Sequence, residues 1–272
     1  MNLDQQKRFQ EKLAVVTGAS RGLGKRIAEA FVREGCRVAL LGRNADALLA
    51  TASEIGSMAA VFPTDISDPA AVRQTFSAIG QRFGGVDFLI NNAALGHLQT
   101  VEEADDHLLQ EEIGANLLGP IYCMRSAIPL MRLRGRGHIV NVTSESVNMP
   151  YPFLTVYAAT KSAMETLSAG LRTELRGQGI RITVLRSGRM SESGFNRDWP
   201  EDRLARYRQI VKAEGYHAAS GEPISPQITA RAVMDLLSLP REANVDLLEL
   251  RSSGESADTN GPHPPDQPGI KT

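Results

Sequence analysis

Thr17-Gly18-Ala19-Ser20-Arg21-Gly22-Leu23-Gly24 (TGASRGLG) is the stretch of sequence that decides the fold. It joins the apolar run 13–17 (LAVVT) to the amphipathic segment 25–34, so it predicts a strand, a glycine-rich turn and a helix. Glycine in such a turn permits tight bending and lets the backbone approach a phosphate group, which the first amides of the helix then receive. An ordinary glycine-rich turn between a strand and a helix is the alternative interpretation.

Two familiar phosphate-binding motifs do not fit this stretch. A P-loop requires glycine at the position of Ala19 and serine or threonine at the position of Arg26. The spacing G-x-G-x-x-G fails because Ile27 stands where the third glycine would be. The pattern that remains is TGxxxGxG.

The rest of the chain repeats the alternation of a short apolar run and an amphipathic segment. Strands are predicted over 13–17, 37–41, 59–62, 86–91, 138–142 and 181–185. Helices are predicted over 25–34, 45–55, 69–83, 104–133 and 155–176, and we expect Pro120 and Pro129 to kink or interrupt the fourth of these. Several apolar runs are continuous, which is typical of strands buried on both faces of a parallel sheet. The sequence therefore predicts an α/β fold, with one doubly wound domain over 12–250 whose parallel sheet is flanked by helices.

Three segments fall outside this alternation. Residues 1–11 have no hydrophobic period and are expected to form a flexible arm, and 251–272 are rich in proline and are expected to form a disordered tail. The long polar segment 189–226 is typical of a lid over a substrate site or of a disordered insertion. Its four aromatic residues either line an apolar pocket or pack as one face of a helix; they are Phe195, Trp199, Tyr207 and Tyr216.

Composition excludes several classes of protein. The 272 residues include 30 Lys and Arg against 31 Asp and Glu, a net charge of -1 without a basic block, which argues against a nucleic-acid partner. Cys36 and Cys123 lie far apart in apolar stretches, so they predict neither a metal site nor a disulfide framework, and they favour a reducing compartment. No apolar run approaches the ~18 residues of a membrane span, and the polar segment 1–12 is unlike a signal peptide. We therefore expect a soluble, cytoplasmic protein.

The end of the second predicted strand indicates which dinucleotide the chain prefers. Dinucleotide-binding proteins that select NAD place Asp or Glu there to hold the ribose 2′-hydroxyl, whereas arginine suits the 2′-phosphate of NADP. Here the acid is missing and Arg43 follows Gly42, with Arg21 as a second possible cation. The sequence therefore favours NADP(H) over NAD, although both arginines could simply be solvated.

A second group of polar residues suggests proton transfer. Tyr157 and Lys161 are spaced i,i+4 within the predicted helix 155–176, so their side chains share one helix face. A nearby ammonium group favours the phenolate, and a tyrosine so placed can exchange a proton with a substrate oxygen. Ser144 follows the strand 138–142, at the edge where parallel sheets place ligands, although a helix cap is its commoner role. Asn116 lies within the long fourth helix, where it could equally be a surface residue.

Taken together, these motifs resemble those of the short-chain dehydrogenase/reductase family. The resemblance covers about residues 12–250 and consists of TGxxxGxG, Asp65 after the third strand, NNAA at 91–94, Asn116, Ser144 and YxxxK at 157–161. It implies a Rossmann-type domain and a catalytic tetrad. In that tetrad Tyr157 is the general acid/base, Lys161 lowers its pKa and holds the nicotinamide ribose, and Ser144 polarises the substrate carbonyl. Asn116 would kink its helix around a water of the proton relay.

The resemblance also implies how the cofactor is held. The pyrophosphate side would contact the glycine loop, through Gly18, Ser20, Arg21, Gly22, Leu23 and Gly24. Arg43 would meet the 2′-phosphate and Asp65 the adenine, while Asn92 and Ala93 would meet the adenosine-side ribose.

Three positions depart from the family's pattern, and all lie near the nicotinamide side. Ala94 stands in place of the glycine of NNAG, and Ser187 in place of the proline that usually precedes Gly188. Glu192 occupies the place of an expected threonine, so a neighbouring serine, Ser191 or Ser193, would have to contact the carboxamide.

The resemblance implies an NADP(H)-dependent oxidoreductase that interconverts a ketone or aldehyde and an alcohol by hydride transfer. The alternative is a catalytically silent NADP(H)-binding sensor or scaffold with the same fold. The aromatic residues of 189–226 favour a medium-sized or bulky hydrophobic substrate. By resemblance alone, a homodimer or homotetramer is expected.

Overall fold

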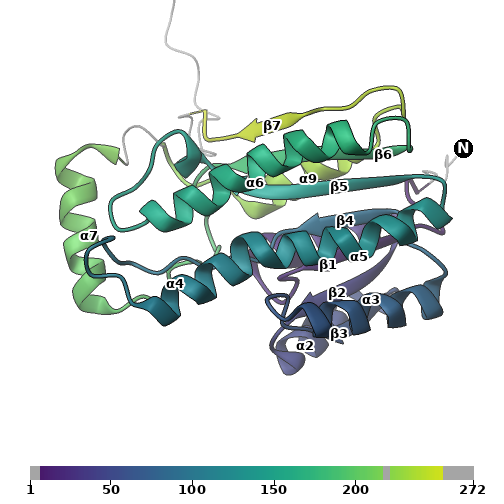
Figure 1. The fold of residues 1–272 in the computed structure, drawn as a ribbon, viewed down its shortest axis with the longest axis horizontal. Helices are drawn as coiled ribbons and strands as arrows, with labels where there is room; N and C mark the ends of the chain where they lie inside the picture. The colour runs from purple at the N-terminus through teal and green to yellow at the C-terminus, as the bar shows by residue number, and fades with distance from the viewer. Residues whose placement is uncertain (1–6, 217–220, 254–272) are drawn as a thin grey trace, which may run out of the picture.

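The computed structural model describes residues 7–216 and 221–253, which contain one seven-stranded sheet (Figure 1). Every neighbouring pair of strands is parallel, in the order β3-β2-β1-β4-β5-β6-β7. The strands are β1 (Leu13–Thr17), β2 (Arg37–Gly42), β3 (Ala59–Pro63), β4 (Phe88–Asn91), β5 (Gly137–Ser144), β6 (Ile180–Ser187) and β7 (Leu247–Leu250). The strand order reverses between β1 and β4, and a doubly wound sheet binds its ligand at the carboxyl ends of the strands at such a switch point. The predicted α/β fold is confirmed.

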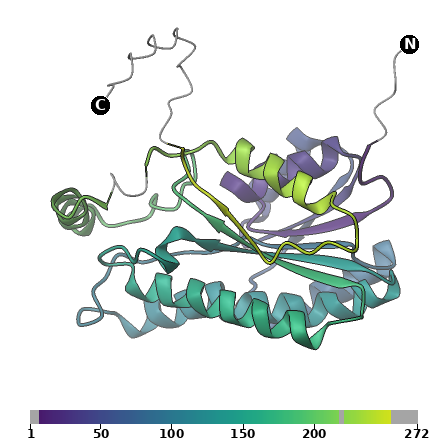
Figure 2. The same ribbon diagram turned by 90° about the horizontal axis from the view of Figure 1, so that it is seen from above.

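Helices cover both faces of the sheet (Figure 2). One face is covered by α1 (Gly22–Arg33), α2 (Ala45–Ile55) and α9 (Pro226–Leu237). The other is covered by α3 (Pro69–Phe83), α5 (Gly119–Leu133) and α6 (Thr155–Glu174). The helix α4 (Asp106–Ile113) precedes α5, and α7 (Glu201–Ala213) lies beyond the end of the sheet (Figure 1).

Strand β1 shows why the apolar runs are continuous. Ala14 and Val16 point into the core under α1 and α9, whereas Leu13 and Val15 point into the core under α3, α5 and α6. All four are fully buried, because each face of a parallel sheet is covered by helices. Alternate residues thus serve two separate cores.

The long helix predicted over 104–133 is irregular at a different place from the one expected. A π-turn (Gly114–Leu118) separates α4 from α5, and Pro120 then lies in the first turn of α5, where a missing N–H costs little. Pro129 lies inside α5 without ending it. The irregular turn therefore surrounds Asn116, where the family resemblance implies a kink, and ends two residues before Pro120.

The expected arm over 1–11 is also wrong for its described part, 7–11. Phe9 is only 1% exposed and packs against the rings of Phe31 and Phe88, with centroids 5.8 and 5.1 Å away. Arg8 forms ion pairs with Glu34 and Asp235. This segment is anchored by the Phe9 ring, which packs between Phe31 of α1 and Phe88 of β4, and by the ion pairs of Arg8.

Two other predicted segments lie partly outside the described residues. Of the expected tail, 254–272 lie outside them, and so do 217–220 of the segment 189–226. Two elements near the end of the chain, α9 and β7, were not among the predicted elements. In the described part of the chain, no helix is long and apolar enough to cross a membrane.

Candidate active site

The glycine loop bends sharply because its backbone is packed against its neighbours. Gly18 and Gly22 have positive φ, +65° and +51°, which L side chains rarely adopt. A Cβ atom at Gly24 would lie 2.3 Å from the Gly18 carbonyl oxygen, and one at Gly18 would lie 2.9 Å from Ala93 Cα. Helix α1 begins at Gly22 without a side-chain cap, so its first amides donate to no side chain among the described residues. A loop this close to the strand and this open at the helix start fits a bound phosphate.

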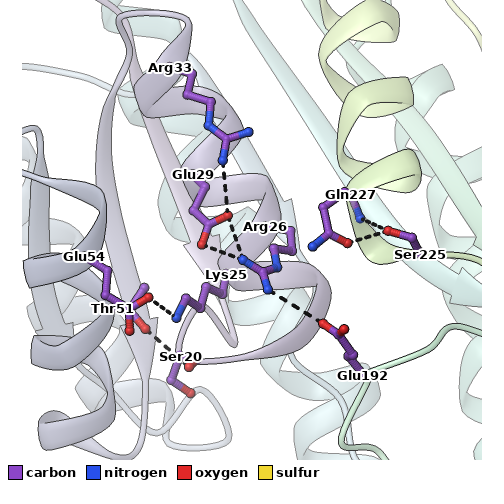
Figure 3. Close-up of polar contacts among 10 residues, drawn as sticks. All are labelled: Ser20, Lys25, Arg26, Glu29, Arg33, Thr51, Glu54, Glu192, Ser225 and Gln227. Carbon is purple, nitrogen blue, oxygen red and sulfur yellow. Dashed lines mark hydrogen bonds and ion pairs between the residues drawn. The ribbon is translucent and has the colours of Figure 1, made fainter.

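Contacts around the loop fix it from two sides (Figure 3). On the α2 side, Thr51 Oγ1 donates a hydrogen bond to the Ser20 carbonyl oxygen, over 3.3 Å. On the other side, Arg26 of α1 forms an ion pair with Glu192, 3.7 Å away. Glu192, where the family pattern has threonine, therefore ties the segment after β6 to the start of α1. The segment also touches the loop directly, because a Cβ at Gly22 would lie 2.9 Å from the Ser193 carbonyl oxygen.

The predicted residues of the adenosine side follow β2, β3 and β4. Arg43 follows the end of β2 with its side chain 63% exposed, and its Nη1 lies 3.0 Å from Glu111 Oε1. Asp65 is exposed after β3, where its Oδ1 accepts hydrogen bonds from the amide and hydroxyl of Ser67. Asn92 Nδ2 donates to the Thr17 carbonyl oxygen over 3.0 Å, which joins the loop after β4 to the glycine loop. All these residues lie at the carboxyl edge of the sheet.

Tyr157 and Ser144 meet beside the carboxyl end of β5. Ser144 is the last residue of β5, and its Oγ accepts a hydrogen bond from the Ser146 amide over 3.2 Å. Burial raises the pKa of Tyr157 to about 12, a hydrogen bond with the Ser144 side chain lowers that pKa, and the charge of Glu112 raises it. The Ser144 hydrogen bond is the one contribution that favours the phenolate, and desolvation outweighs it.

Lys161 lies one helical turn beyond Tyr157 and faces the same site. Its Nζ donates a hydrogen bond to the Val142 carbonyl oxygen over 3.0 Å and lies 5.6 Å from the centre of the Tyr157 ring. The side chain is buried, and this desolvation lowers the pKa of Lys161 to about 8, while the charge of Glu112 raises it. The shared helix face predicted for the pair is confirmed.

Asn116 is buried in the π-turn and holds two neighbouring segments. Its Oδ1 accepts from the Leu95 amide over 2.9 Å, and its Nδ2 donates to the Leu95 carbonyl oxygen and to Thr160 Oγ1, over 2.7 and 3.2 Å. Both amide hydrogens are thereby engaged, one with the loop after β4 and one with α6 next to Lys161. In this arrangement Asn116 positions the site's backbone rather than presenting a free donor.

Glu112 is a residue of the site that the sequence reasoning missed. It lies one turn before Asn116, is fully buried, and its Oε2 accepts a hydrogen bond from the His97 amide over 3.0 Å. Burial raises the pKa of Glu112 to about 7, while that hydrogen bond and the charge of Lys161 lower it. The i,i+4 spacing of Glu112 and Asn116 was the available signal, because it places both on one helix face.

Aromatic side chains of the segment 189–226 form a wall against Tyr157. The Phe195 ring lies 4.9 Å from the Tyr157 ring and 5.4 Å from that of Trp199, which in turn lies 5.6 Å from Tyr207. Trp199 Nε1 donates to the Gly96 carbonyl oxygen over 2.6 Å. The rings pack on one another, and the Phe195 ring also lies against Tyr157. They do not form one face of a helix, because only Tyr207 lies within α7.

Comparison with known proteins agrees with this geometry. The sequence model of the family described as short chain dehydrogenase matches residues 12–204. An oxidoreductase of Staphylococcus aureus (strain N315), itself described as uncharacterized, is 30% identical over 242 residues, 89% of this chain and 97% of the relative. An NADP-dependent 3-hydroxy acid dehydrogenase of Salmonella typhi is 29% identical over 88% of this chain and 94% of its own length.

Solved structures show the same fold. An alcohol dehydrogenase of the archaeon Thermococcus sibiricus, complexed with 5-hydroxy-NADP, superposes with a TM-score of 0.75 at 30% identity and covers 90% of this chain and 98% of its own. A 3-ketoacyl-(acyl-carrier-protein) reductase from Brucella melitensis, complexed with NADH, has a TM-score of 0.77 at 27% identity and covers 90% of this chain and 98% of its own. From the parallel sheet, the glycine loop and these matches, we conclude that the chain belongs to the short-chain dehydrogenase/reductase family of oxidoreductases.

Proposed function

We propose that this protein is an NADP(H)-dependent oxidoreductase that interconverts a ketone or aldehyde and the corresponding alcohol. The observation that carries the proposal is the convergence of Tyr157, Ser144 and Lys161 at the carboxyl end of β5. An acid, a hydrogen-bonding hydroxyl and a cation at one point are what a carbonyl needs when its oxygen gains negative charge.

The described residues fit a dinucleotide cofactor, which would supply or accept the hydride. The close approaches at Gly18 and Gly24 leave no room for a side chain, as expected where a pyrophosphate lies against the backbone. In our proposal the glycine loop, 18–24, holds the pyrophosphate, Arg43 the 2′-phosphate and Asp65 the adenine. Asn92 and Ala93 border the adenosine-side ribose, and Tyr157 and Lys161 border the nicotinamide ribose.

The protonation states of the site suit carbonyl reduction at neutral pH. Because burial raises the pKa of Tyr157 to about 12, its phenol stays protonated and can donate a proton to the carbonyl oxygen. Ser144 donates a hydrogen bond to the same oxygen in this proposal and orients the carbonyl. The pKa of Lys161, about 8, keeps its ammonium mainly charged at pH 7, so it stabilises the phenolate that remains.

The relatives support this class of reaction and this cofactor. Their names include an alcohol dehydrogenase complexed with 5-hydroxy-NADP, a serine dehydrogenase complexed with NADP+ and an NADP-dependent 3-hydroxy acid dehydrogenase. Each name describes oxidation at a carbon that bears a hydroxyl group or use of NADP. The 3-ketoacyl reductase bound to NADH shows that the cofactor preference has to be measured.

A panel of ketones, aldehydes and alcohols tests the proposal. NADPH and NADH are supplied side by side, and turnover is followed by the absorbance of the reduced nicotinamide. We expect turnover of at least one apolar ketone with a clear preference for NADPH. Tight NADPH binding without turnover across the panel would favour the silent sensor instead, and equal use of both cofactors would remove the argument from Arg43.

Replacing Arg43 tests the cofactor preference directly. Arg43→Ala is expected to weaken NADPH binding by about 10-fold or more, because a charge-assisted hydrogen bond to a phosphate contributes about 1.5–3 kcal/mol. NADH binding should be unchanged, since NADH lacks the 2′-phosphate. Fluorescence titration of both cofactors measures the effect. Arg73→Ala, an exposed arginine on α3, is the matched control, and an equal loss for both cofactors would contradict the assignment.

Replacing Phe195 tests whether the aromatic wall contacts the substrate. Phe195→Ala removes the ring that lies against Tyr157, and a stacked aromatic contact contributes about 1 kcal/mol. We therefore expect KM for a bulky apolar ketone to rise about fivefold, with NADPH affinity unchanged. Ile210→Ala, an exposed apolar residue of α7, is the control. An unchanged KM for every ketone of the panel would show that the wall only packs on itself.

A further inference from the structure

A cleft lies at the opposite end of the sheet from the candidate active site. It has a volume of about 620 Å³ and is lined by residues at or beside the amino ends of the central strands, among them Lys12, Phe88, His138 and Arg181. These strands begin at the right-hand end of the sheet in Figure 1, whereas α7 lies at the left. Strand β5 runs from this cleft to Ser144, and its eight residues separate the two sites by roughly 23 Å.

The cleft is strongly basic. Six cationic residues line it against a single carboxylate, Asp87, in a protein whose net charge is -1. The cationic residues are Arg8, Lys12, Arg136, Arg176, Arg181 and Arg241. Positive charge is therefore concentrated here and balanced by acidic residues elsewhere in the chain.

The carboxylates nearby are already engaged. Asp87 accepts hydrogen bonds from Arg136 Nε and from the Leu13 amide, over 3.2 and 3.0 Å. Arg8 is paired with Glu34 and Asp235. These contacts neutralise Arg8 and Arg136. The other four cationic residues of the cleft are Lys12, Arg176, Arg181 and Arg241.

None of those four cations is paired with a carboxylate among residues 7–216 and 221–253. Arg181 donates only to backbone carbonyls, including that of Ala243 over 2.8 Å, and Lys12 Nζ lies over the rings of Phe9 and Phe88. Burial and then repulsion by neighbouring arginines, Arg241 among them, lower the pKa of both Lys12 and Arg181. The cations repel one another, so an anion placed between them would be stabilised.

His138 adds a polar group without a partner at the wall of the cleft. It is 2% exposed, its Nε2 lies 2.9 Å from Thr183 Oγ1, and its Nδ1 has no hydrogen-bond partner within the described chain. Burial, followed by the charge of Arg181, lowers the pKa of His138 to about 3, so the ring is neutral. When Nε2 accepts from the Thr183 hydroxyl, Nδ1 carries the proton. Because Nδ1 is itself buried, His138 forms a neutral part of the cleft wall and makes no contact with a ligand in the cleft.

We propose that this cleft binds a small molecule that carries a phosphate or pyrophosphate group. Arginine forks match the oxygens of phosphate, and several cations around one cavity favour a multiply charged anion over a single carboxylate. The volume lies within the range of small-molecule sites and exceeds what one phosphate ion needs. This site is separate from the proposed cofactor site, because the glycine loop lies at the other end of the sheet.

Calorimetric titration with pyrophosphate tests the site on the full chain. The titration is made with and without saturating NADPH, so the outcome does not depend on the proposed cofactor loop. We expect one bound pyrophosphate that NADPH does not displace. Binding that disappears in NADPH would place the probe in the cofactor loop and overturn the proposal, as would no binding at millimolar pyrophosphate.

Paired variants separate the cleft from general surface charge. Arg176→Gln with Arg241→Gln is expected to weaken pyrophosphate binding at least tenfold, and both side chains are exposed, so folding should be retained. Arg73→Gln with Arg208→Gln removes the same charge from α3 and α7 and should leave the affinity unchanged. Lys12→Met is the second test, since Met keeps the apolar stem beside Phe9 and Phe88. Equal losses in the two double variants, or full affinity in all cleft variants, would overturn the proposal.

Discussion

Tyr157→Phe is expected to lower kcat for carbonyl reduction by a factor of about 10³ or more, while NADPH binds with its wild-type affinity. Phenylalanine keeps the ring that packs against Phe195 and removes only the hydroxyl. Without that hydroxyl the carbonyl oxygen loses its proton donor, because Lys161 Nζ is held on the Val142 carbonyl oxygen, 5.6 Å from the centre of the ring. General acid catalysis alone contributes about 10²–10⁴ in rate.

Steady-state turnover and fluorescence titration of NADPH, made on the same preparation, distinguish loss of chemistry from loss of binding. Tyr122→Phe is the matched control, because Tyr122 is partly buried on α5 and outside the candidate site. It should keep wild-type turnover. Undiminished kcat in Tyr157→Phe would contradict the mechanism, whereas loss of NADPH affinity would show that the hydroxyl mainly holds the cofactor.

The fold was predictable where a local pattern determines it. The helices over 45–55 and 69–83 match the prediction residue for residue, because Asn44 and Asp68 cap them and glycines follow their last residues. Tertiary packing determines the features that the local sequence pattern did not predict. Phe9 is anchored by rings far away in the sequence, and among the described strands β7 pairs with β6 alone, at the edge of the sheet.

The site was predictable as a set of residues but not as an electrostatic environment. Tyr157 and Lys161 could be placed on one helix face from their spacing. The sequence could not show that Lys161 is buried and Tyr157 partly buried, and desolvation decides the direction of both pKa shifts. Glu112 was missed for the same reason, because an acidic residue in a polar helix is expected to be solvated unless the fold buries it.

Glu112→Gln is expected to raise the free energy of unfolding above that of the wild type by more at pH 7.5 than at pH 5. The pKa of Glu112 is about 7 when folded and about 4.5 when unfolded, so between these values the folded state binds more protons. Its contribution to stability is therefore fully present below pH 4.5 and is lost as the pH rises through 7. Glutamine stays neutral and still accepts from the His97 amide, so it avoids this loss, which amounts to about 2 kcal/mol after allowance for Lys161 and screening.

The difference in the free energy of unfolding between variant and wild type, measured at both pH values, isolates this effect from other titrating groups. His138, whose pKa is lowered to about 3, changes stability in the opposite direction over part of this range, but equally in both proteins. Glu111→Gln is the control one residue earlier, where a partly exposed side chain pairs with Arg43 and His97. A difference that does not change with pH would contradict the buried charge at Glu112.

Because that charge also raises the pKa of Tyr157, the same variant should oxidise an alcohol at lower pH than the wild type, which links the stability cost to the proton-transfer site.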